Sequence, residues 1–208
     1  ISRASEVAPL VVKTNFAGRV HRRVPLDLFM VPRFEAGELV SLSVHAGIWT
    51  SAAMAAHPAE VPRLRAGLSA LAARLGFDPG GHNSKALAHA LTELPHDLMI
   101  GFGRADLERV ALAMIGLVDR PRPRLLLVRS ALSRHLFAFV WLPRDAVSTA
   151  LRQQIQAMLE AAAGGPVLDW SLEVEGGHLA LIRFVIDIRE QDTRPNEAAL
   201  DRQLHRMV

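Results

Sequence analysis

The stretch HLFAFVWL, residues 135–142, decides the fold because it is apolar on both sides. Side chains alternate along a strand, so Phe137, Phe139 and Trp141 lie on one face, while the equally apolar residues between them lie on the other. Such a strand belongs inside a sheet with both faces covered. Helices of the same domain can cover only one face. We therefore expect the other face to meet another sheet, another domain or a second subunit.

The segments around this strand predict an α+β domain. Residues 124–129 form a strand before it. A helix that is capped by Asp145 or Thr149 and has Leu151 and Ile155 inward follows it and ends at Gly164. Residues 167–175 alternate between apolar and polar side chains, and Gly176-Gly177 is typical of a tight hairpin turn into the last strand. The order is close to a ferredoxin-like sandwich, in which helices lie on one face of an antiparallel sheet.

A helical linker block is predicted upstream of this domain. The first helix opens near Pro58, carries leucines three and four residues apart, and ends at Gly76. A second helix is capped by Asn83 or Ser84 and stops at Pro95. A third has Asp106 in its first turn, where the helix dipole favours an acidic residue.

The N-terminal part predicts three short strands, at residues 10–16, 28–34 and 39–44, separated by turn-prone residues. Such a small sheet does not close a core alone, so we expect it to complete a domain whose first half lies upstream. The chain begins at Ile1 without a leader peptide, and we expect it to be cut from a longer protein.

Composition excludes several classes of function. The absence of cysteine rules out a disulfide framework, a thiolate zinc site and a cysteine nucleophile. Charged residues interrupt every apolar stretch, so we expect a soluble, cytoplasmic chain without a membrane span. The net charge is only +3, and the arginines are interleaved with acidic residues, so we expect no nucleic-acid partner.

Candidate chemical groups are few. His82, His89 and His96 recur every seven residues, but seven residues rise about 10 Å along a helix, too far to share one metal ion. The glycine-containing loops at residues 78–81 and 101–103 match no nucleotide-binding pattern. We therefore expect no catalytic, cofactor-binding or metal-binding residue in the chain.

Two further features have competing interpretations. Phe137, Phe139 and Trp141 resemble the base-stacking surface of an RNA-binding sheet, but an aromatic stripe on a strand is more often core or subunit interface. The basic segments at residues 19–23 and 120–124 could hold an anion or an acidic partner, but solvated turns are the simpler interpretation.

Short motifs follow one another in a fixed order over about residues 10 to 190. They are Val20-His21-Arg22, Leu26-Asp27 and Trp49-Thr50-Ser51-Ala52-Ala53, then Pro62-Arg63-Leu64-Arg65, Gly76-Phe77-Asp78-Pro79, His82-x-x-Lys85-Ala86-Leu87 and Pro95-His96-Asp97, and finally Arg124-Leu125-x-x-Val128-Arg129, Trp141-x-Pro143-Arg144-Asp145 and Thr149-x-x-Arg152-x-x-Ile155. This ordered set resembles the large NAD-specific glutamate dehydrogenases of bacterial type. Met54 and His96 depart from the family pattern, which has tyrosine and arginine there.

The resemblance implies a region of ACT-like modules joined by helices, upstream of the catalytic domain. It implies four parts: the end of one ACT-like module (1–50), a helical connecting segment (51–120), a second ACT-like module (121–190) and a polar tail with a short helix (191–208). The parent would use NAD to oxidise L-glutamate to 2-oxoglutarate and ammonia, and it would act as a homo-oligomer. The part represented by this chain would be non-catalytic and would bind no NAD. Its partners would be the other domains of the same polypeptide, and an amino acid is a possible effector.

Two alternatives remain open. One is a stand-alone ACT-type sensor that binds amino acids and carries no enzyme. The other is an RNA-binding sandwich, which would require binding to single-stranded RNA that weakens with salt.

Overall fold

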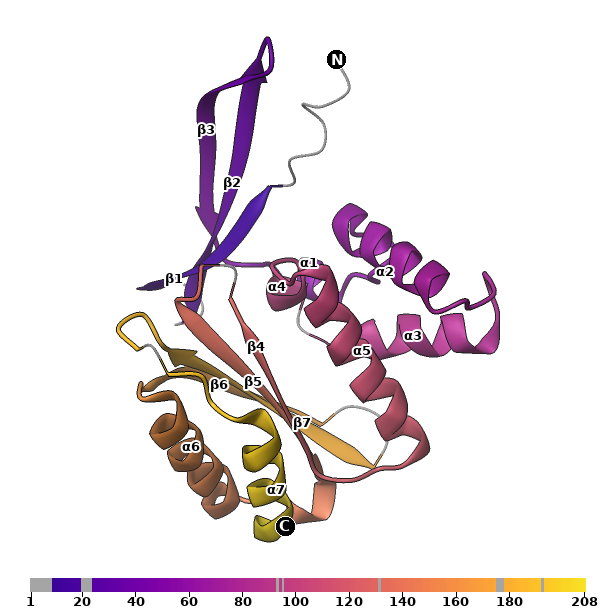
Figure 1. Cartoon of the computed structure of the whole chain (residues 1–208), viewed down its shortest axis with the longest axis vertical. Coiled ribbons are helices and arrows are strands. Elements are labelled where there is room, and N and C mark those ends of the chain that lie inside the picture. Colours follow the sequence, from indigo (N-terminus) through magenta and orange to yellow (C-terminus); the bar gives the residue numbers. More distant parts are fainter. Residues whose placement is uncertain are drawn as a thin grey trace.

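The computed structural model describes residues 9–19, 24–92, 94, 96–130, 132–174, 178–191 and 193–208. Figure 1 shows a small sheet with a projecting hairpin, a group of helices, and a larger sheet that lies between those helices and two others. No helix in the described ranges has both the length and the apolar character that a membrane crossing requires.

The N-terminal sheet consists of β1 (Leu10–Ala17), β2 (Pro25–Glu35) and β3 (Glu38–Gly47), all antiparallel in the order β1-β2-β3. The three predicted strands are thereby confirmed. Ala36 and Gly37 connect β2 and β3 with positive φ angles of 50° and 90°. The tight turn lets the two strands run together as a long hairpin away from the body (Figure 1).

The helical segment follows as α1 (Ser51–Ala55), α2 (Pro62–Arg74), α3 (His82–Thr92), α4 (His96–Met99) and α5 (Arg104–Asp119). The three predicted helices correspond to α2, α3 and α5. The first begins at Pro62 rather than near Pro58, because residues 58–60 form a turn. The short helices α1 and α4 were not predicted, since neither is long enough to show a helical period.

The larger sheet consists of β4 (Arg124–Arg129), β5 (His135–Pro143), β6 (Val167–Glu173) and β7 (Leu179–Asp187). All neighbours are antiparallel in the order β4-β5-β7-β6. With α6 (Thr149–Ala163) and α7 (Glu197–Met207), this is a ferredoxin-like sandwich in which the usual last strand comes first. The predicted α+β class is confirmed. The predicted Gly176-Gly177 turn lies outside the described residues.

The ends of α6 show how the sequence sets a helix boundary. Ser148 is the N-cap, and its hydroxyl accepts a hydrogen bond of 3.1 Å from the Leu151 amide. The predicted caps, Asp145 and Thr149, were therefore wrong. Asp145 lies in a 3-10 turn and Thr149 is already the first helical residue. Gly164 ends the helix with a φ of 75°, as its sequence position predicted.

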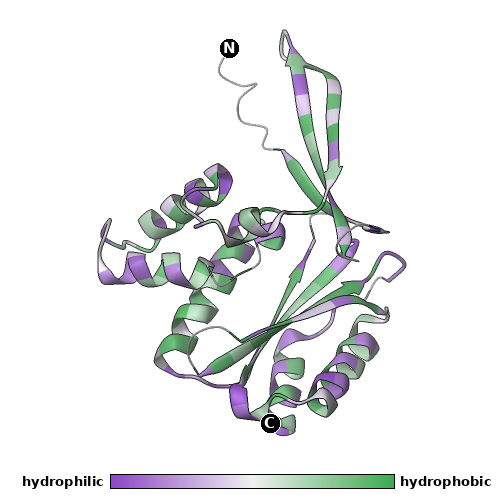
Figure 2. Ribbon diagram, turned by 180° about the vertical axis from the view of Figure 1, so that it is seen from behind, coloured by the Kyte–Doolittle hydropathy of each residue, from purple (hydrophilic) through white to green (hydrophobic). Residues whose placement is uncertain are grey.

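The two faces of β5 lie in two different cores. Leu136, Val140 and their neighbours pack with α6 and α7, whereas Phe137, Phe139 and Trp141 pack with the helical segment. Figure 2 shows the apolar residues along this central sheet. The domain's own helices, α6 and α7, cover only one face, as expected (Figure 1). The second face meets another part of the same chain, the helical segment.

Residues 191–208 contain the expected short helix, α7. Its Leu200 and Leu204 are buried in the same core as α6. The helix also packs against β4 at the edge of the sheet. The polar segment therefore forms part of the α+β domain rather than a separate tail.

Candidate functional site

A buried group of four charged side chains lies where the three parts of the chain meet. We call it the junction cluster: Lys13 on β1, Asp27 on β2, Asp97 on α4 and Arg183 on β7. Lys13 Nζ lies 3.0 Å from Asp27 Oδ1 and 2.8 Å from Asp97 Oδ2. Arg183 Nη1 lies 3.6 Å from Asp97 Oδ1, an ion pair longer than a hydrogen bond. The cluster therefore links the N-terminal sheet, the helical segment and the α+β domain.

Burial controls the electrostatics of the junction cluster. Loss of water raises the pKa of Asp27 to about 6, because desolvation outweighs the attraction of Lys13. The pKa of Asp97 is lowered: desolvation acts against this, but Lys13 and Arg183 together outweigh it. Two cations thus face two carboxyl groups, one of which gains a proton near pH 6. Breaking such a buried set by removing one member leaves an unpaired charge, which is costly.

Sequence reasoning missed the junction cluster, although a signal was present. Lys13, Asp27 and Arg183 each interrupt an apolar strand, and Lys13 is one of only two lysines in an arginine-rich chain. A polar side chain on a strand is normally assigned to the solvent face. Here the opposite face of each strand is apolar too, so the charge meets another part of the chain instead of water.

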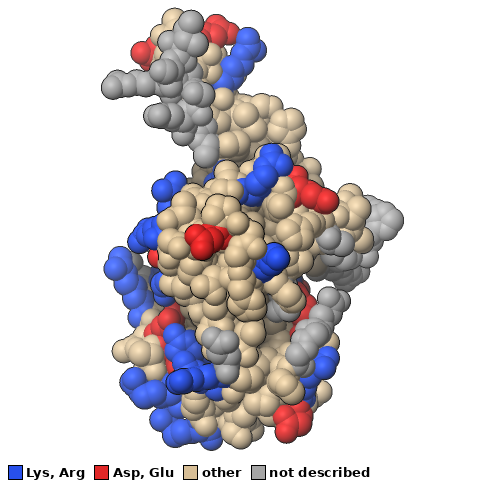
Figure 3. Space-filling view, turned by 90° about the vertical axis from the view of Figure 1, so that its right-hand side faces the viewer, with Lys and Arg blue, Asp and Glu red and all other residues tan. Residues whose placement is uncertain are grey.

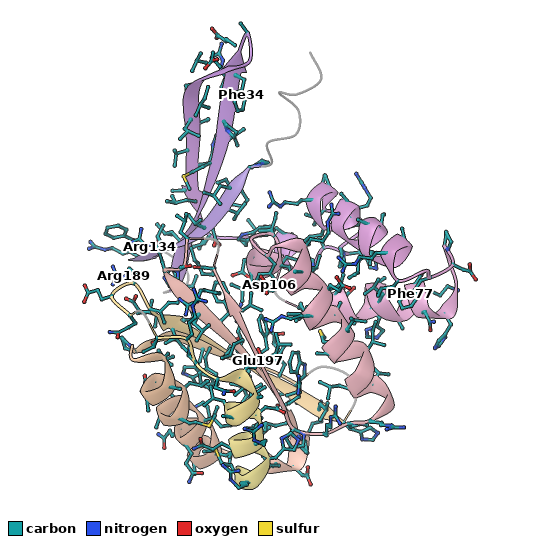
Figure 4. The ribbon with its side chains drawn as sticks, viewed as in Figure 1. Phe34, Phe77, Asp106, Arg134, Arg189 and Glu197 are labelled. Atoms are coloured by element: carbon teal, nitrogen blue, oxygen red, sulfur yellow. The ribbon has the colours of Figure 1, made fainter. Side chains whose placement is uncertain are left out.

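A second feature is a cavity of about 850 Å³ between α5, the β4–β5 loop and the connection from β7 to α7. We call it the arginine cavity. Figure 4 labels three residues of its wall, Asp106 on α5, Arg189 after β7 and Glu197 at the start of α7. Its guanidinium groups belong to Arg109, Arg129, Arg189 and Arg194. Its volume falls in the range of small-molecule sites.

The three histidines singled out from the sequence do not come together on one helix. His82 and His89 are exposed on α3, while His96 lies on α4 and is fully buried. His96 Nδ1 lies 3.3 Å from the Ala53 carbonyl, so this ring joins α4 to α1. Within the described ranges, no three His, Asp or Glu side chains are grouped so that they could hold a metal ion.

The aromatic stripe is core, as predicted. Phe137, Phe139 and Trp141 are at most 4% exposed. Phe102 packs against Phe137 and Phe139 with ring centroids 6.1 and 6.0 Å away. The stripe is therefore closed to nucleic-acid bases. The loop containing Phe102 serves packing: a Cβ on Gly101 would lie 3.2 Å from the Val11 carbonyl oxygen.

The two basic segments have different outcomes. Of residues 19–23, all but Arg19 lie outside the described residues. In the other segment, Arg124 Nη1 lies 3.0 Å from Asp201 Oδ2 on α7. Arg124 therefore holds α7 against β4 rather than facing solvent alone. Figure 3 shows that basic side chains on one face are interspersed with acidic and uncharged ones, with the densest group in the lower part.

Known families match two segments of the chain. Residues 61–120 match the family described as "Glutamate dehydrogenase, helical motif 1". Residues 124–208 match "Glutamate dehydrogenase, ACT2 domain". The first segment contains α2 to α5, and the second contains the whole α+β domain, including α7.

Individual relatives agree with these matches. The chain is 27% identical to the NAD-specific glutamate dehydrogenase of Halomonas elongata over 94% of its length, and 26% identical to that of Pseudomonas aeruginosa over 85%. It is 26% identical to the Mycobacterium tuberculosis protein of the same name over 69%. These alignments cover 12%, 11% and 9% of the relatives, so the chain spans about a tenth of their length. The resemblance drawn from the motifs is confirmed.

Proposed function

The chain belongs to the glutamate dehydrogenase family, of which it carries helical motif 1 and the ACT2 domain, and from this we propose that it is a non-catalytic regulatory and assembly region of an NAD-dependent glutamate dehydrogenase. The parent protein would oxidise L-glutamate to 2-oxoglutarate and ammonia in the cytoplasm. The groups for this chemistry and the NAD site would lie in other parts of the polypeptide. The parent would act as a homo-oligomer.

The junction cluster is the observation that carries the proposal. Lys13 and Asp97 join the N-terminal sheet to the helical segment, and Arg183 joins that segment to the ACT2 domain. A change in the packing of one part therefore alters buried charge contacts in the other two. Such shared contacts give the coupling free energy that regulation between distant sites requires.

An exposed apolar sheet face supports the assembly role. Leu10, Met30 and Val44 are paired across β1, β2 and β3 and so lie in one row on the same face. Leu42, next along β3, lies on this face too; its exposed fraction is 54%, and that of Val44 is 55%. We call this row and Leu42 the hairpin face. Figure 2 shows apolar residues along the projecting strands.

The occupant that we propose for the hairpin face is the upstream part of the same polypeptide. The ACT2 sheet gives the precedent within this chain, since α6 and α7 cover one of its faces. The N-terminal sheet has no described helix on the hairpin face. An ACT-like module formed by residues 1–50 with upstream helices would cover it, and the relatives are long enough to supply them. The boundaries at 50 and 120 belong to this proposal, and the second module continues past 190 to include α7.

Adjacent residues on β3 allow a matched test. Leu42 lies on the hairpin face and Ser41 on the opposite face, and both are exposed in this chain. We expect Leu42→Glu to lower the thermal unfolding midpoint of the full-length parent by several degrees and to change its assembly state in analytical ultracentrifugation. Ser41→Glu should change neither. In the 208-residue chain alone, both variants should unfold like the unsubstituted chain.

Two results would contradict the proposal. If Leu42→Glu and Ser41→Glu had the same effect in the full-length parent, the hairpin face would not be covered there. Glutamate oxidation by the 208-residue chain with NAD would refute its non-catalytic role. The alternative, a stand-alone amino-acid sensor, predicts a complete and stable protein of about this length. The much greater length of the relatives favours the dehydrogenase region.

A further inference from the structure

Four guanidinium groups line the arginine cavity, and two of them, those of Arg109 and Arg189, are paired with carboxylates. Arg109 Nη1 lies 3.2 Å from Glu197 Oε2, and its Nη2 donates to the Leu127 carbonyl at 2.5 Å and lies 3.3 Å from Asp106. Arg189 binds the carboxylate of Asp187 through Nε and Nη2. The positive charges of these two side chains are therefore already balanced by carboxylates.

The other two guanidinium groups, those of Arg129 and Arg194, have no carboxylate partner within the part of the chain that the structure describes. Arg129 Nη2 donates to the Thr193 carbonyl at 2.7 Å, and a guanidinium offers four further N–H donors. Arg194 is exposed on the connection to α7, and no described residue forms a hydrogen bond or ion pair with its guanidinium. Two positive charges in one cavity are thus available to an anion.

Part of the cavity wall is apolar. Leu132 lines the cavity and is 48% exposed, whereas Leu127, Leu136 and Ile188 in the same wall are buried. An ion without carbon atoms would leave the Leu132 side chain in contact with water. A ligand with an aliphatic chain between anionic ends would cover this side chain and pair with the two guanidinium groups at once.

We propose that the arginine cavity binds a small aliphatic dicarboxylate, a class that includes the acidic amino acids. Ligand binding at this site would serve the regulatory role proposed above, and the inference rests on that role. The wall of the cavity combines Asp106 of helical motif 1 with residues of the ACT2 domain, so a bound ligand stabilises one relative packing of the two. Binding there therefore acts on the arrangement that the junction cluster also holds.

Calorimetric titration of the 208-residue chain tests this site directly. Glutarate and L-glutamate are the probes, with butyrate and inorganic phosphate as comparisons. We expect one saturable site for at least one of the two probes, weakened by raised salt because charged groups carry it. Arg129→Met and Arg194→Met should each weaken binding at least tenfold. Arg202→Met is the matched control, since Arg202 is exposed on α7 away from the cavity wall.

A second measurement protects the test against a variant that does not fold. In the unsubstituted chain, the bound probe should slow amide hydrogen exchange at Arg189 and Gln191, which line the cavity. Absence of saturable binding, equal binding by the arginine variants, or phosphate binding as tight as that of the dicarboxylates would each overturn the proposal. None of these outcomes bears on the role of Leu42 in the full-length parent, so the two proposals fail separately.

Discussion

Lys13 Nζ lies 2.8 Å from Asp97 Oδ2, although 84 residues separate the two positions in sequence. The lysine side chain is 5% exposed and the aspartate side chain 12%. The bond joins the first described strand to a four-residue helix that has little stability of its own. The position of α4, and with it the contact of Asp97 with Arg183, therefore depends on Lys13.

We predict that Lys13→Met destabilises the chain by about 3 to 5 kcal/mol, because it leaves Asp27 and Asp97 buried without their shared cation. Lys85→Met provides the control, since Lys85 is the other lysine and is exposed on α3. Its effect should stay within about 0.5 kcal/mol. Urea unfolding followed by circular dichroism measures both. Similar losses for the two variants would show that the junction cluster adds no stability.

Stability should depend on pH through two groups that act in opposite directions. The pKa of Asp27 is raised from 3.8 to about 6, so its contribution is complete below pH 3.8 and is lost as pH rises through 6. The pKa of His135 is lowered from 6.5 to about 4 by burial, so its contribution is complete above pH 6.5 and is lost as pH falls through 4. Each amounts to on the order of 2 to 3 kcal/mol.

Two variants separate these contributions between pH 4 and 6.5. In Asp27→Asn, the His135 contribution remains, so the unfolding midpoint should fall on acidification. In His135→Gln, the Asp27 contribution remains, so the midpoint should rise on acidification. The unsubstituted chain should vary less than either variant. Thermal unfolding midpoints measured at four or five pH values test this. If the midpoint changed with pH in the same direction in both variants, the contributions of Asp27 and His135 would not be as stated.

A third prediction uses two tryptophans of the same domain. Trp141 is 4% exposed and stacks on Phe139, whereas Trp170 is 45% exposed beneath the Arg152 guanidinium, 4.5 Å from the ring centroid. Trp141→Ala should cost about 3 to 5 kcal/mol. Trp170→Ala should cost about 1 kcal/mol, as expected for an exposed cation–π contact. Denaturant unfolding tests this, and a cost for Trp170→Ala that matched the buried site would mean that its face is covered in solution.

Residues 135–142 and the segments around them were enough to predict the α+β domain. A strand that is apolar on both faces requires two covering layers, and glycines after the helices mark their ends. The sequence did not reveal which segment forms the second layer. Helices α2, α3 and α5 are amphipathic, but a helical period shows only that one side is buried and does not identify its partner. The identity of the second layer therefore depends on tertiary packing.

The candidate sites were harder to predict than the fold, for a related reason. Lys13, Asp27 and Arg183 lie on three strands and meet only because those strands pack around α4. Arg129 and Arg194 are 65 positions apart and belong to different elements. Each such charge, taken alone along the sequence, is typical of a solvated side chain. Motifs of fixed spacing find sites within one element, whereas these sites are formed between elements.

The last prediction concerns the edge strand β4. The Leu127 amide donates to Glu197 Oε2 at 2.8 Å, and the Leu125 amide donates to Asp201 Oδ1 at 2.7 Å. Two carboxylates one turn apart on α7 thus accept hydrogen bonds from the outer side of β4, whose one strand partner among the described residues is β5. An edge strand with unpaired amides invites pairing with another chain. The acidic face of α7 blocks this edge.

Glu197→Ala and Asp201→Ala should each cost about 1 to 3 kcal/mol, because each leaves a strand amide without its acceptor. The double variant should in addition self-associate as its concentration rises, since the edge of β4 is then open. Glu60→Ala, at an exposed position between α1 and α2, is the control for loss of an acidic side chain. Sedimentation velocity over a range of concentrations measures association. If the double variant stayed as monomeric as the control, the carboxylates would stabilise α7 without protecting the edge of the sheet.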